Sequence, residues 1–155
     1  MSSSLMLNLG CGANLLPGYM NLDGNLGNSI YPLDYTDIDE IRASHVLEHY
    51  GIEESFDVLQ QWVSCLKIGG ILKIAVPDFS DLMRRKGLGE ILPFEEIIMG
   101  SQIDERDYHK SLWDLDKLRT LMGYCGLTDI QSWHSSIRDC ASYPFSLNLQ
   151  GTKRS

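Results

Sequence analysis

Apolar residues gather in short runs along this chain, and the runs end at glycine, proline or aspartate. A short apolar run bounded by turn-forming residues is typical of a buried β-strand. By this criterion the pattern predicts strands over residues 5–9, 19–22, 30–33, 41–44, 71–76, 127–133 and 145–151. The segment 30–33 is the least marked of them, because a proline interrupts it.

A second periodicity, of three and four residues, predicts helices between the strands. The apolar stripe of the longest helix consists of Ile52, Phe56, Leu59, Val63 and Leu66. We expect this helix to stop at Gly69-Gly70, because glycine commonly ends helices. Ser111, with Asp114 three residues later, has a capping-box pattern and predicts the start of another helix, which Gly126 ends. A further short helix is expected over 95–99.

Strands and helices alternate along the chain, so the expected fold class is α/β with a layered sheet. Ligands of such open sheets lie outside the carboxyl ends of the strands. Residues that could bind a ligand follow several of the predicted strands: Gly10–Asn14, Asp23, Asp34, Ser44–His45 and Asp78. This coincidence predicts a ligand site at one edge of the sheet.

The composition is that of an ordinary soluble domain. With 155 residues, 43% hydrophobic and 22% charged, the chain is expected to form one domain over residues 1–155. No apolar run approaches the ~20 residues of a membrane span, and the first residues lack the basic leader of a signal peptide. We therefore expect a cytoplasmic protein without a membrane partner.

The net charge and its distribution along the chain limit the classes of ligand that we expect. Thirteen basic and 21 acidic side chains give a net charge of -8, which argues against nucleic acid as a partner. No lysine or arginine precedes Arg42, so the segment with the predicted ligand site is acidic. The four cysteines lie far apart without a C-x-x-C pair, which is typical of a reduced protein rather than a disulfide framework or zinc site.

The glycine turn after the first strand favours a nucleoside ligand. Gly10 and Gly12 allow a sharp turn and a close approach of the backbone to a ligand, and the Asp23 carboxylate can accept both hydrogen bonds of a ribose diol. A dinucleotide fits poorly, because Leu15 stands at the third glycine position and Pro17-Gly18 leaves no helix to face a pyrophosphate. A positively charged nucleoside, such as S-adenosylmethionine, suits the acidic segment better.

Several longer stretches carry a resemblance to a known family. They are LNLGCGAN (7–14), YMNLDG (19–24), ASHVLEH (43–49), LKIGGILKIAVPDF (66–79) and HKSLWDLDKLRTLMGYCGL (109–127). In this order they resemble class I S-adenosylmethionine-dependent methyltransferases, and more narrowly the small bacterial type 11-like methyltransferases often associated with glycan synthesis. The resemblance implies a Rossmann-like, mostly parallel sheet of seven strands in the order 3-2-1-4-5-7-6, with an antiparallel last strand.

The resemblance also implies roles for individual residues. Those expected to bind the cofactor are Gly10, Cys11 and Gly12 at its methionine part, Asp23 at the ribose, Leu33 and Asp34 at adenine, and Ser44 and His45 at the sulfonium. Asn8 and Asn14 depart from the family pattern, in which an acidic residue and a glycine are usual. The segment between Gly12 and Asp23 is too short for the usual helix, so helical cover is expected to be reduced there. The site is then open, or a homodimer completes it.

Methyl transfer to a small-molecule or glycan acceptor is the activity that the resemblance implies. The reaction is an in-line displacement in which the protein mainly aligns the nucleophile, and a general base helps when the nucleophile carries a proton. His45, His49, Asp78 and His109 lie where a base could act; we expect His109 and Asp78 to be catalytic. Either residue could have a structural role instead, His109 as a polar loop or capping histidine and Asp78 as a turn residue or helix cap.

Two other functions remain open at this stage. His45-Val46-Leu47-Glu48-His49 matches the H-x-x-E-H pattern of inverted zinc peptidases, although we expect no metal site because a glycine follows at position 51 and the chain is short for a peptidase cleft. A non-catalytic relative that binds the cofactor and acts through a partner is the other alternative. Trp62, Trp113 and Trp133 are expected in the core rather than in a substrate cage.

Overall fold

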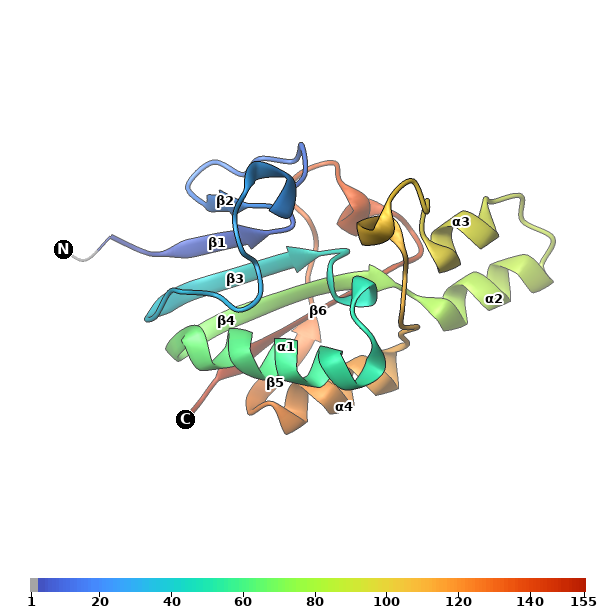
Figure 1. The fold of residues 1–155 in the computed structure, drawn as a ribbon. Coiled ribbons are helices and arrows are strands. Elements are labelled where there is room, and N and C mark those ends of the chain that lie inside the picture. The colour runs from blue at the N-terminus through green and yellow to red at the C-terminus, as the bar shows by residue number, and fades with distance from the viewer. Residues whose placement is uncertain (1–2) are drawn as a thin grey trace.

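The computed structural model describes residues 3–155, which form one mixed sheet with helices against it (Figure 1). The strands are β1 (Met6–Leu9), β2 (Met20–Leu22), β3 (Ile38–Ser44), β4 (Leu66–Pro77), β5 (Leu127–Ser132) and β6 (Ser146–Lys153). The helices are α1 (Ile52–Cys65), α2 (Phe79–Gly87), α3 (Phe94–Met99) and α4 (Leu115–Tyr124). Short 3-10 turns cover Gly24–Leu26, Leu47–His49, Glu105–Asp107 and Cys140–Ser142.

The strand order in the sheet is β2-β1-β3-β4-β6-β5. The first four strands in this order are parallel, whereas β6 runs antiparallel to both β4 and β5. The expected α/β, Rossmann-like class and the antiparallel last strand are therefore confirmed. Parallel pairing brings the carboxyl ends of β1, β2 and β3 to one edge of the sheet, where the expected ligand residues follow them.

The expectation of seven strands is wrong, because the described residues form six. The missing one is the strand predicted over 30–33. Side chains of α1 take the place of a strand partner there: Gln61 bonds both the N–H and the carbonyl of Leu33 at 3.0 Å, and the Trp62 indole donates to the Ile30 carbonyl at 2.7 Å. Backbone groups satisfied in this way need no sheet ladder.

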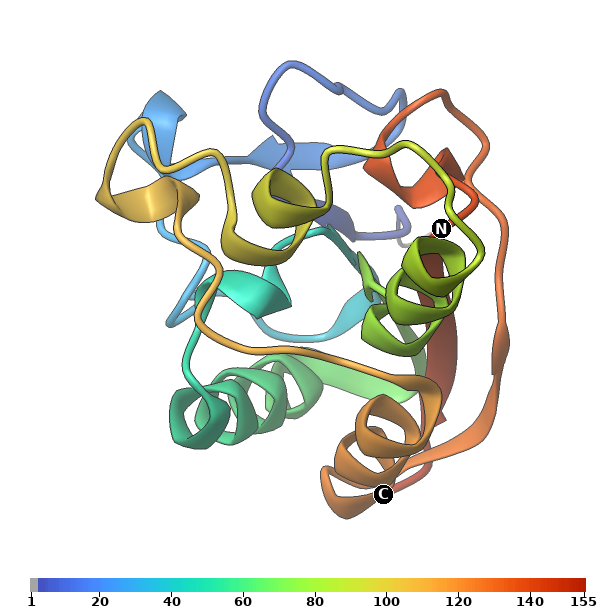
Figure 2. The same ribbon diagram turned by 90° about the vertical axis from the view of Figure 1, so that its right-hand side faces the viewer.

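One face of the sheet carries the hydrophobic core. Alternate side chains of β1, β3 and β4 point to this face, where α1 and α4 cover them (Figures 1 and 2). The central members are Leu7, Leu9, Ile41, Ala43, Leu72, Ile74 and Val76 from the strands, with Leu59, Trp62, Val63, Leu118 and Met122 from the helices. All three tryptophans are buried, as expected of core residues.

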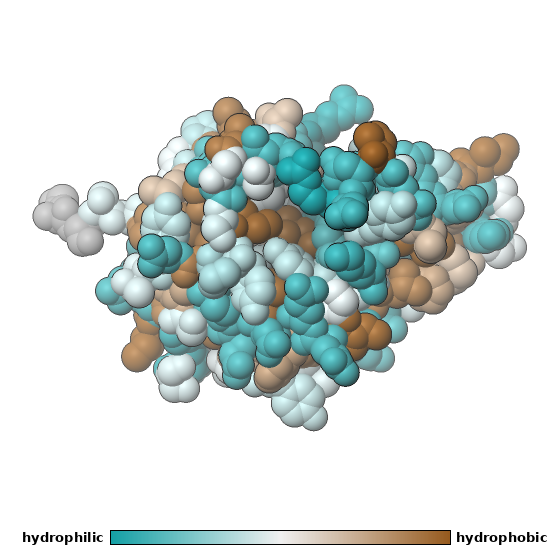
Figure 3. Space-filling model, viewed as in Figure 1, coloured by the Kyte–Doolittle hydropathy of each residue, from teal (hydrophilic) through white to brown (hydrophobic). Residues whose placement is uncertain are grey.

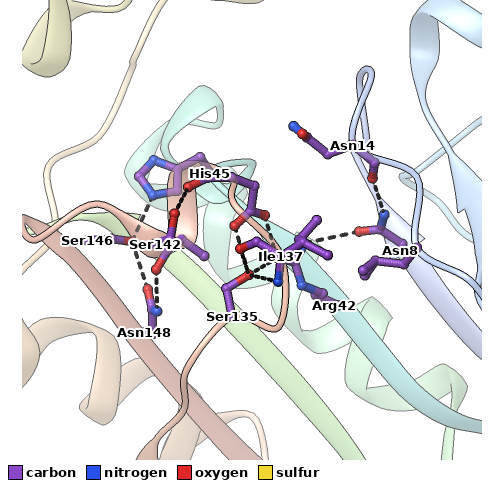
Figure 4. A network of polar contacts seen from close by, with 12 residues as sticks. Asn8, Asn14, Arg42, His45, Ser135, Ile137, Ser142, Ser146 and Asn148 are labelled. Atoms are coloured by element: carbon purple, nitrogen blue, oxygen red, sulfur yellow. Dashed lines mark hydrogen bonds and ion pairs between the residues drawn. The ribbon is translucent and has the colours of Figure 1, made fainter.

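The opposite face is polar and lacks a helix over β1 and β3. Its buried side chains include Asn8 from β1 and Arg42 from β3, and Arg42 forms an ion pair with Asp139 (Figure 4). Ser135 joins the same network, so the segment 133–145 covers this face in place of a helix. The predicted reduction of helical cover in the N-terminal half is therefore confirmed.

Two helix boundaries differ from the expected ones. The chain enters β4 directly at Leu66, so Gly69 lies inside the strand with φ +82° rather than after a helix. Asp114, not Ser111, caps α4, because its carboxylate accepts from the Lys117 N–H at 2.9 Å. The Ser111 hydroxyl is instead the acceptor for the Trp113 indole.

The sequence pattern missed α2, which projects with α3 from the carboxyl end of β4 (Figure 1). This helix is rich in charged residues, and Leu82 is the one residue in it that is buried. Among residues 3–155, no helix combines the length and the apolar character that crossing a bilayer requires.

Candidate functional site

A cavity of about 500 Å³ lies at the carboxyl ends of β1, β2 and β3. Gly10 and Asp23 line it from the loops after β1 and β2, and His45 and His49 line it from the segment after β3. The opposite wall belongs to Glu105, Arg106, Asp107 and Lys110, just before α4. Figure 3 shows this hollow above α1, with apolar groups at its floor and hydrophilic groups around it.

The glycine turn forms the floor next to β1. Gly10 and Gly12 have φ values of +61° and +50°, in the left-handed region that favours glycine. A Cβ added to Gly10 would come within 2.5 Å of the Val46 side chain, whereas nothing lies within 4 Å of one added to Gly12. Gly10 therefore allows the backbone to pack closely against Val46 at the cavity.

Alanine at position 10 or position 12 is destabilising by about 1–2 kcal/mol, because the backbone there is left-handed. Only Gly10→Ala must also displace the Val46 side chain. We expect Gly10→Ala to lower the free energy of unfolding by about 2–4 kcal/mol and Gly12→Ala by no more than about 2 kcal/mol. Urea denaturation of the two variants measures both values, and equal losses would contradict the assigned role of Gly10.

Two backbone amides fix the Asp23 carboxylate at the cavity. The Gly12 N–H donates to Oδ2 at 2.9 Å, and the Asn25 N–H donates to Oδ1 at 2.8 Å. Each carboxylate oxygen has a second lone pair, so the group can still accept two hydrogen bonds from a ligand. The position after β2 and the fixed orientation suit recognition of a pair of hydroxyls.

Asparagine at position 8 has a structural reason. The buried Asn8 amide donates to the Asn14 carbonyl at 3.0 Å and to the Asn21 side chain at 2.8 Å, and its oxygen accepts from Arg42 at 3.3 Å (Figure 4). A carboxylate at this position could not donate these bonds. Asn8 thus holds the two ends of the glycine loop in place.

The other residues expected at the cofactor lie around the cavity rather than on its surface. Cys11 is buried and lies in the glycine turn, and the buried Ser44 hydroxyl has no hydrogen-bond partner within residues 3–155. Leu33 is buried against α1, while Asp34 is exposed; neither lines the cavity. Ile30 occupies that side of the wall instead.

His45 is held in an unusual backbone conformation at the end of β3. Its φ is +55°, which is costly for a residue with a side chain and is often found at functional sites. The imidazole Nε2 lies 2.8 Å from the Ser146 hydroxyl, which in turn donates to Asn148 (Figure 4). Burial, together with the neighbouring His109, lowers the pKa of His45 to about 4, so the ring is neutral at physiological pH.

Glu48 was not expected at this site from the sequence, and His49 was named only as one of four positions where a base could act. Glu48 is buried, neither of its carboxylate oxygens has a hydrogen-bond partner in the part of the chain that the structure describes, and burial raises its pKa to about 8. His49 lines the cavity beside it, and burial lowers the pKa of its imidazole. The only available signal was the H-x-x-E-H spacing, which was weighed as a peptidase pattern.

The two residues expected to be catalytic do not line this cavity. His109 packs edge-on against the His49 ring, with centroids 4.8 Å apart, and burial lowers its pKa to about 4. Asp78 accepts from the Asp81 N–H at 3.2 Å and caps α2, and it lines a different cavity beside Trp133. His109 therefore lies against His49 rather than on the cavity surface, and Asp78 lines a different cavity from Asp23.

The geometry does not support the peptidase alternative. In H-x-x-E-H peptidases the two histidines share one face of a helix, but here His45 follows a strand with left-handed φ and His49 ends a 3-10 turn. The buried Glu48 carboxylate is also out of contact with solvent, so it cannot activate a water molecule.

Comparisons with known proteins identify the fold. No protein-family model and no curated protein matches the chain. A methyltransferase dependent on S-adenosylmethionine from Thermotoga maritima has a similar structure, with TM-score 0.62 and 13% identity over 99% of this chain and 84% of that one. A magnesium protoporphyrin IX methyltransferase from Synechocystis, solved with bound S-adenosylhomocysteine, gives TM-score 0.59 and 18% identity over 97% and 74%.

A third similar structure is a methyltransferase from Haloferax volcanii in complex with the activator Trm112, with TM-score 0.60 and 12% identity over 99% of this chain and 84% of that chain. Other similar structures are longer, and this chain spans 62% of one of them, from Bordetella parapertussis. The strand order, the antiparallel last strand and these likenesses agree. The chain therefore has the fold of class I S-adenosylmethionine-dependent methyltransferases.

Proposed function

We propose that the protein binds S-adenosylmethionine in the cavity at the carboxyl ends of β1–β3 and transfers its methyl group to a small-molecule or glycan acceptor. The observation that carries this proposal is the Asp23 carboxylate, which two backbone amides fix at the cavity wall with lone pairs free for a ribose diol. Nucleic acid is disfavoured as an acceptor by the net charge of -8.

The residues present fit this cofactor. The cavity volume of about 500 Å³ lies within the range of small-molecule sites. Gly10 has no side chain and packs against Val46, and both residues line the cavity, so the glycine turn lies close to the space for a ligand. Carboxylates of Glu54, Glu105 and Asp107 line the walls together with Arg106 and Lys110. These mixed charges suit a ligand with a sulfonium, an ammonium and a carboxylate.

When bound, S-adenosylmethionine supplies a methyl group activated by its sulfonium. The protein's part is to align an acceptor and exclude water, and alignment alone can lower a barrier by several kcal/mol. His45 suits this part, because the Ser146 contact fixes a neutral ring at the cavity wall. We assign Asp78 to capping α2, and His109 to the support of His49 rather than to direct contact with the acceptor.

A non-catalytic, partner-dependent protein is the second candidate. It is favoured by the sheet face that lacks a helix over β1 and β3, and by the Haloferax methyltransferase that was solved together with an activator protein. Both candidate functions place the cofactor at the same site, but only the enzyme transfers the methyl group to an acceptor.

Calorimetric titration with S-adenosylmethionine, S-adenosylhomocysteine and NAD tests the cofactor assignment. We expect the first two to bind with one site per chain and NAD not to bind, because the glycine turn is followed by Pro17-Gly18 rather than by a helix. Failure of both adenosyl compounds to bind would refute the proposal. Formation of S-adenosylhomocysteine with sugar or small hydroxylated acceptors then separates the enzyme from the non-catalytic candidate.

A further inference from the structure

Beside the cavity lies a buried carboxylate that the proposed function does not use. The Glu48 side chain is 2% exposed, and neither of its oxygens has a hydrogen-bond partner among the described residues. Burying such a group without a partner is costly, and nearly all buried polar groups in proteins are paired. An unpaired buried carboxylate therefore points to a proton or a cation that satisfies it.

Three imidazoles lie near this carboxylate, and the nearest belongs to His45, whose Nδ1 is 3.5 Å from Glu48 Oε1. His49 Nε2 is 4.0 Å from Glu48 Oε1, and the rings of His49 and His109 are in edge-to-face contact. One ligand atom from each of Glu48, His49 and His109 falls within 4.8 Å of the others. Small side-chain movements would bring all three to the distances of about 2.0–2.2 Å from a common ion that nitrogen and carboxylate ligands adopt.

The backbone holds these residues together although they are far apart in sequence. The Lys110 N–H donates to the Glu48 carbonyl at 2.7 Å, and the His109 N–H donates to the Met99 carbonyl at 3.0 Å. The ligand positions are therefore fixed by main-chain hydrogen bonds, and binding an ion need not order a loop first.

The donor set selects the kind of cation. Two neutral imidazoles and one carboxylate are ligands typical of zinc and related divalent transition ions, whereas magnesium and calcium prefer oxygen ligands. Only a neutral imidazole can bind a metal, and each of these two rings offers one nitrogen to a common ion.

We propose that Glu48, His49 and His109 bind one divalent transition ion of the zinc type at the edge of the cavity. The ion joins the turn after β3 to the segment before α4, which forms the opposite cavity wall. This site differs from a peptidase H-x-x-E-H site, because His109 rather than His45 completes the set of three. The His45 Nε2 contacts the Ser146 hydroxyl, and its Nδ1 lies 3.5 Å from Glu48 Oε1. The proposal goes beyond the proposed function and does not depend on cofactor binding.

Titration of the metal-free protein with Co²⁺, followed by visible absorption, tests the site. We expect one equivalent to bind with the d–d bands of a coordinated ion, Zn²⁺ to displace it, and excess Mg²⁺ to leave it in place. Zn²⁺ should also raise the melting temperature, because it binds the folded state. Absence of a cobalt spectrum and of a thermal shift would overturn the proposal and leave Glu48 as a protonated, buried acid.

Variants locate the ion. Glu48→Gln keeps the side-chain volume and is expected to weaken Co²⁺ binding at least 100-fold, because losing even outer-shell partners of metal ligands costs 10–100-fold. His109→Asn should weaken Co²⁺ binding to the same extent. It provides the test if Glu48→Gln does not fold. The exposed His134, the remaining histidine, provides the matched control, and His134→Asn should bind as the wild type does. Equal binding by wild type and Glu48→Gln would place the ion elsewhere and refute the site.

Discussion

Replacing Asp23 with alanine is expected to lower the affinity for S-adenosylmethionine about 100-fold, or ~2.7 kcal/mol. The reason is that the carboxylate would accept two hydrogen bonds from the ribose hydroxyls, and bonds to a charged group contribute about 1.5–3 kcal/mol each. Calorimetry on the variant measures the loss. Unchanged affinity would show that the ribose does not bind at Asp23.

The loss must be separated from damage to the loop, because Asp23 also holds the Gly12 and Asn25 amides. Asp23→Asn retains one acceptor oxygen and removes the charge, so its affinity should fall between those of the wild type and Asp23→Ala. Asp116→Ala is the matched control, since Asp116 is exposed on α4 and does not line the cavity. Its affinity should equal that of the wild type.

Arg42→Met is expected to lower the free energy of unfolding by about 3–5 kcal/mol. Arg42 and Asp139 form an ion pair whose side chains are only 5% and 2% exposed, and removing one partner leaves the other charge buried and unpaired. The guanidinium also donates to Asn8 and Ser135 and lies 5.3 Å from the centre of the Trp133 ring, so the segment 133–145 loses its attachment to β3. Urea denaturation measures the difference.

Two further variants isolate the buried charge as the cause. In Arg42→Met combined with Asp139→Leu no charge is left unpaired, so this protein should recover most of the lost stability. Arg154→Met removes the exposed pair with Asp129 at the surface and should leave the unfolding midpoint nearly unchanged. Wild-type stability of Arg42→Met would contradict the structural role assigned to the ion pair.

Local patterns were sufficient to predict most elements of the fold. The helical spacing of apolar residues marks α1, and the runs at 71–76 and 145–151 mark parts of β4 and β6. The predicted stripe of α1 is only partly correct: Leu59 and Val63 are buried, but Ile52 and Phe56 are exposed, and Val58 and Trp62 complete the buried face. The turn at Gly10–Gly12 and the acidic residue after β2, Asp23, could also be predicted, because turn-forming residues mark the ends of strands.

The features that could not be predicted depend on contacts between distant residues. The segment 30–33 has a strand-like composition, yet Gln61 and Trp62 of α1 bind its backbone, and no local pattern indicates this. The pair Arg42–Asp139 joins residues 97 positions apart. Likewise, His109 meets Glu48 and His49 only because the chain returns to the end of β3 before α4.

A crystal structure with bound S-adenosylhomocysteine would show directly where the cofactor lies. We expect the adenosyl group in the cavity at the carboxyl ends of β1–β3, with both ribose hydroxyls within hydrogen-bond distance of the Asp23 carboxylate and the rest of the ligand against Gly10. A ligand seated elsewhere, for example in the separate cavity beside Asp78 and Trp133, would contradict it.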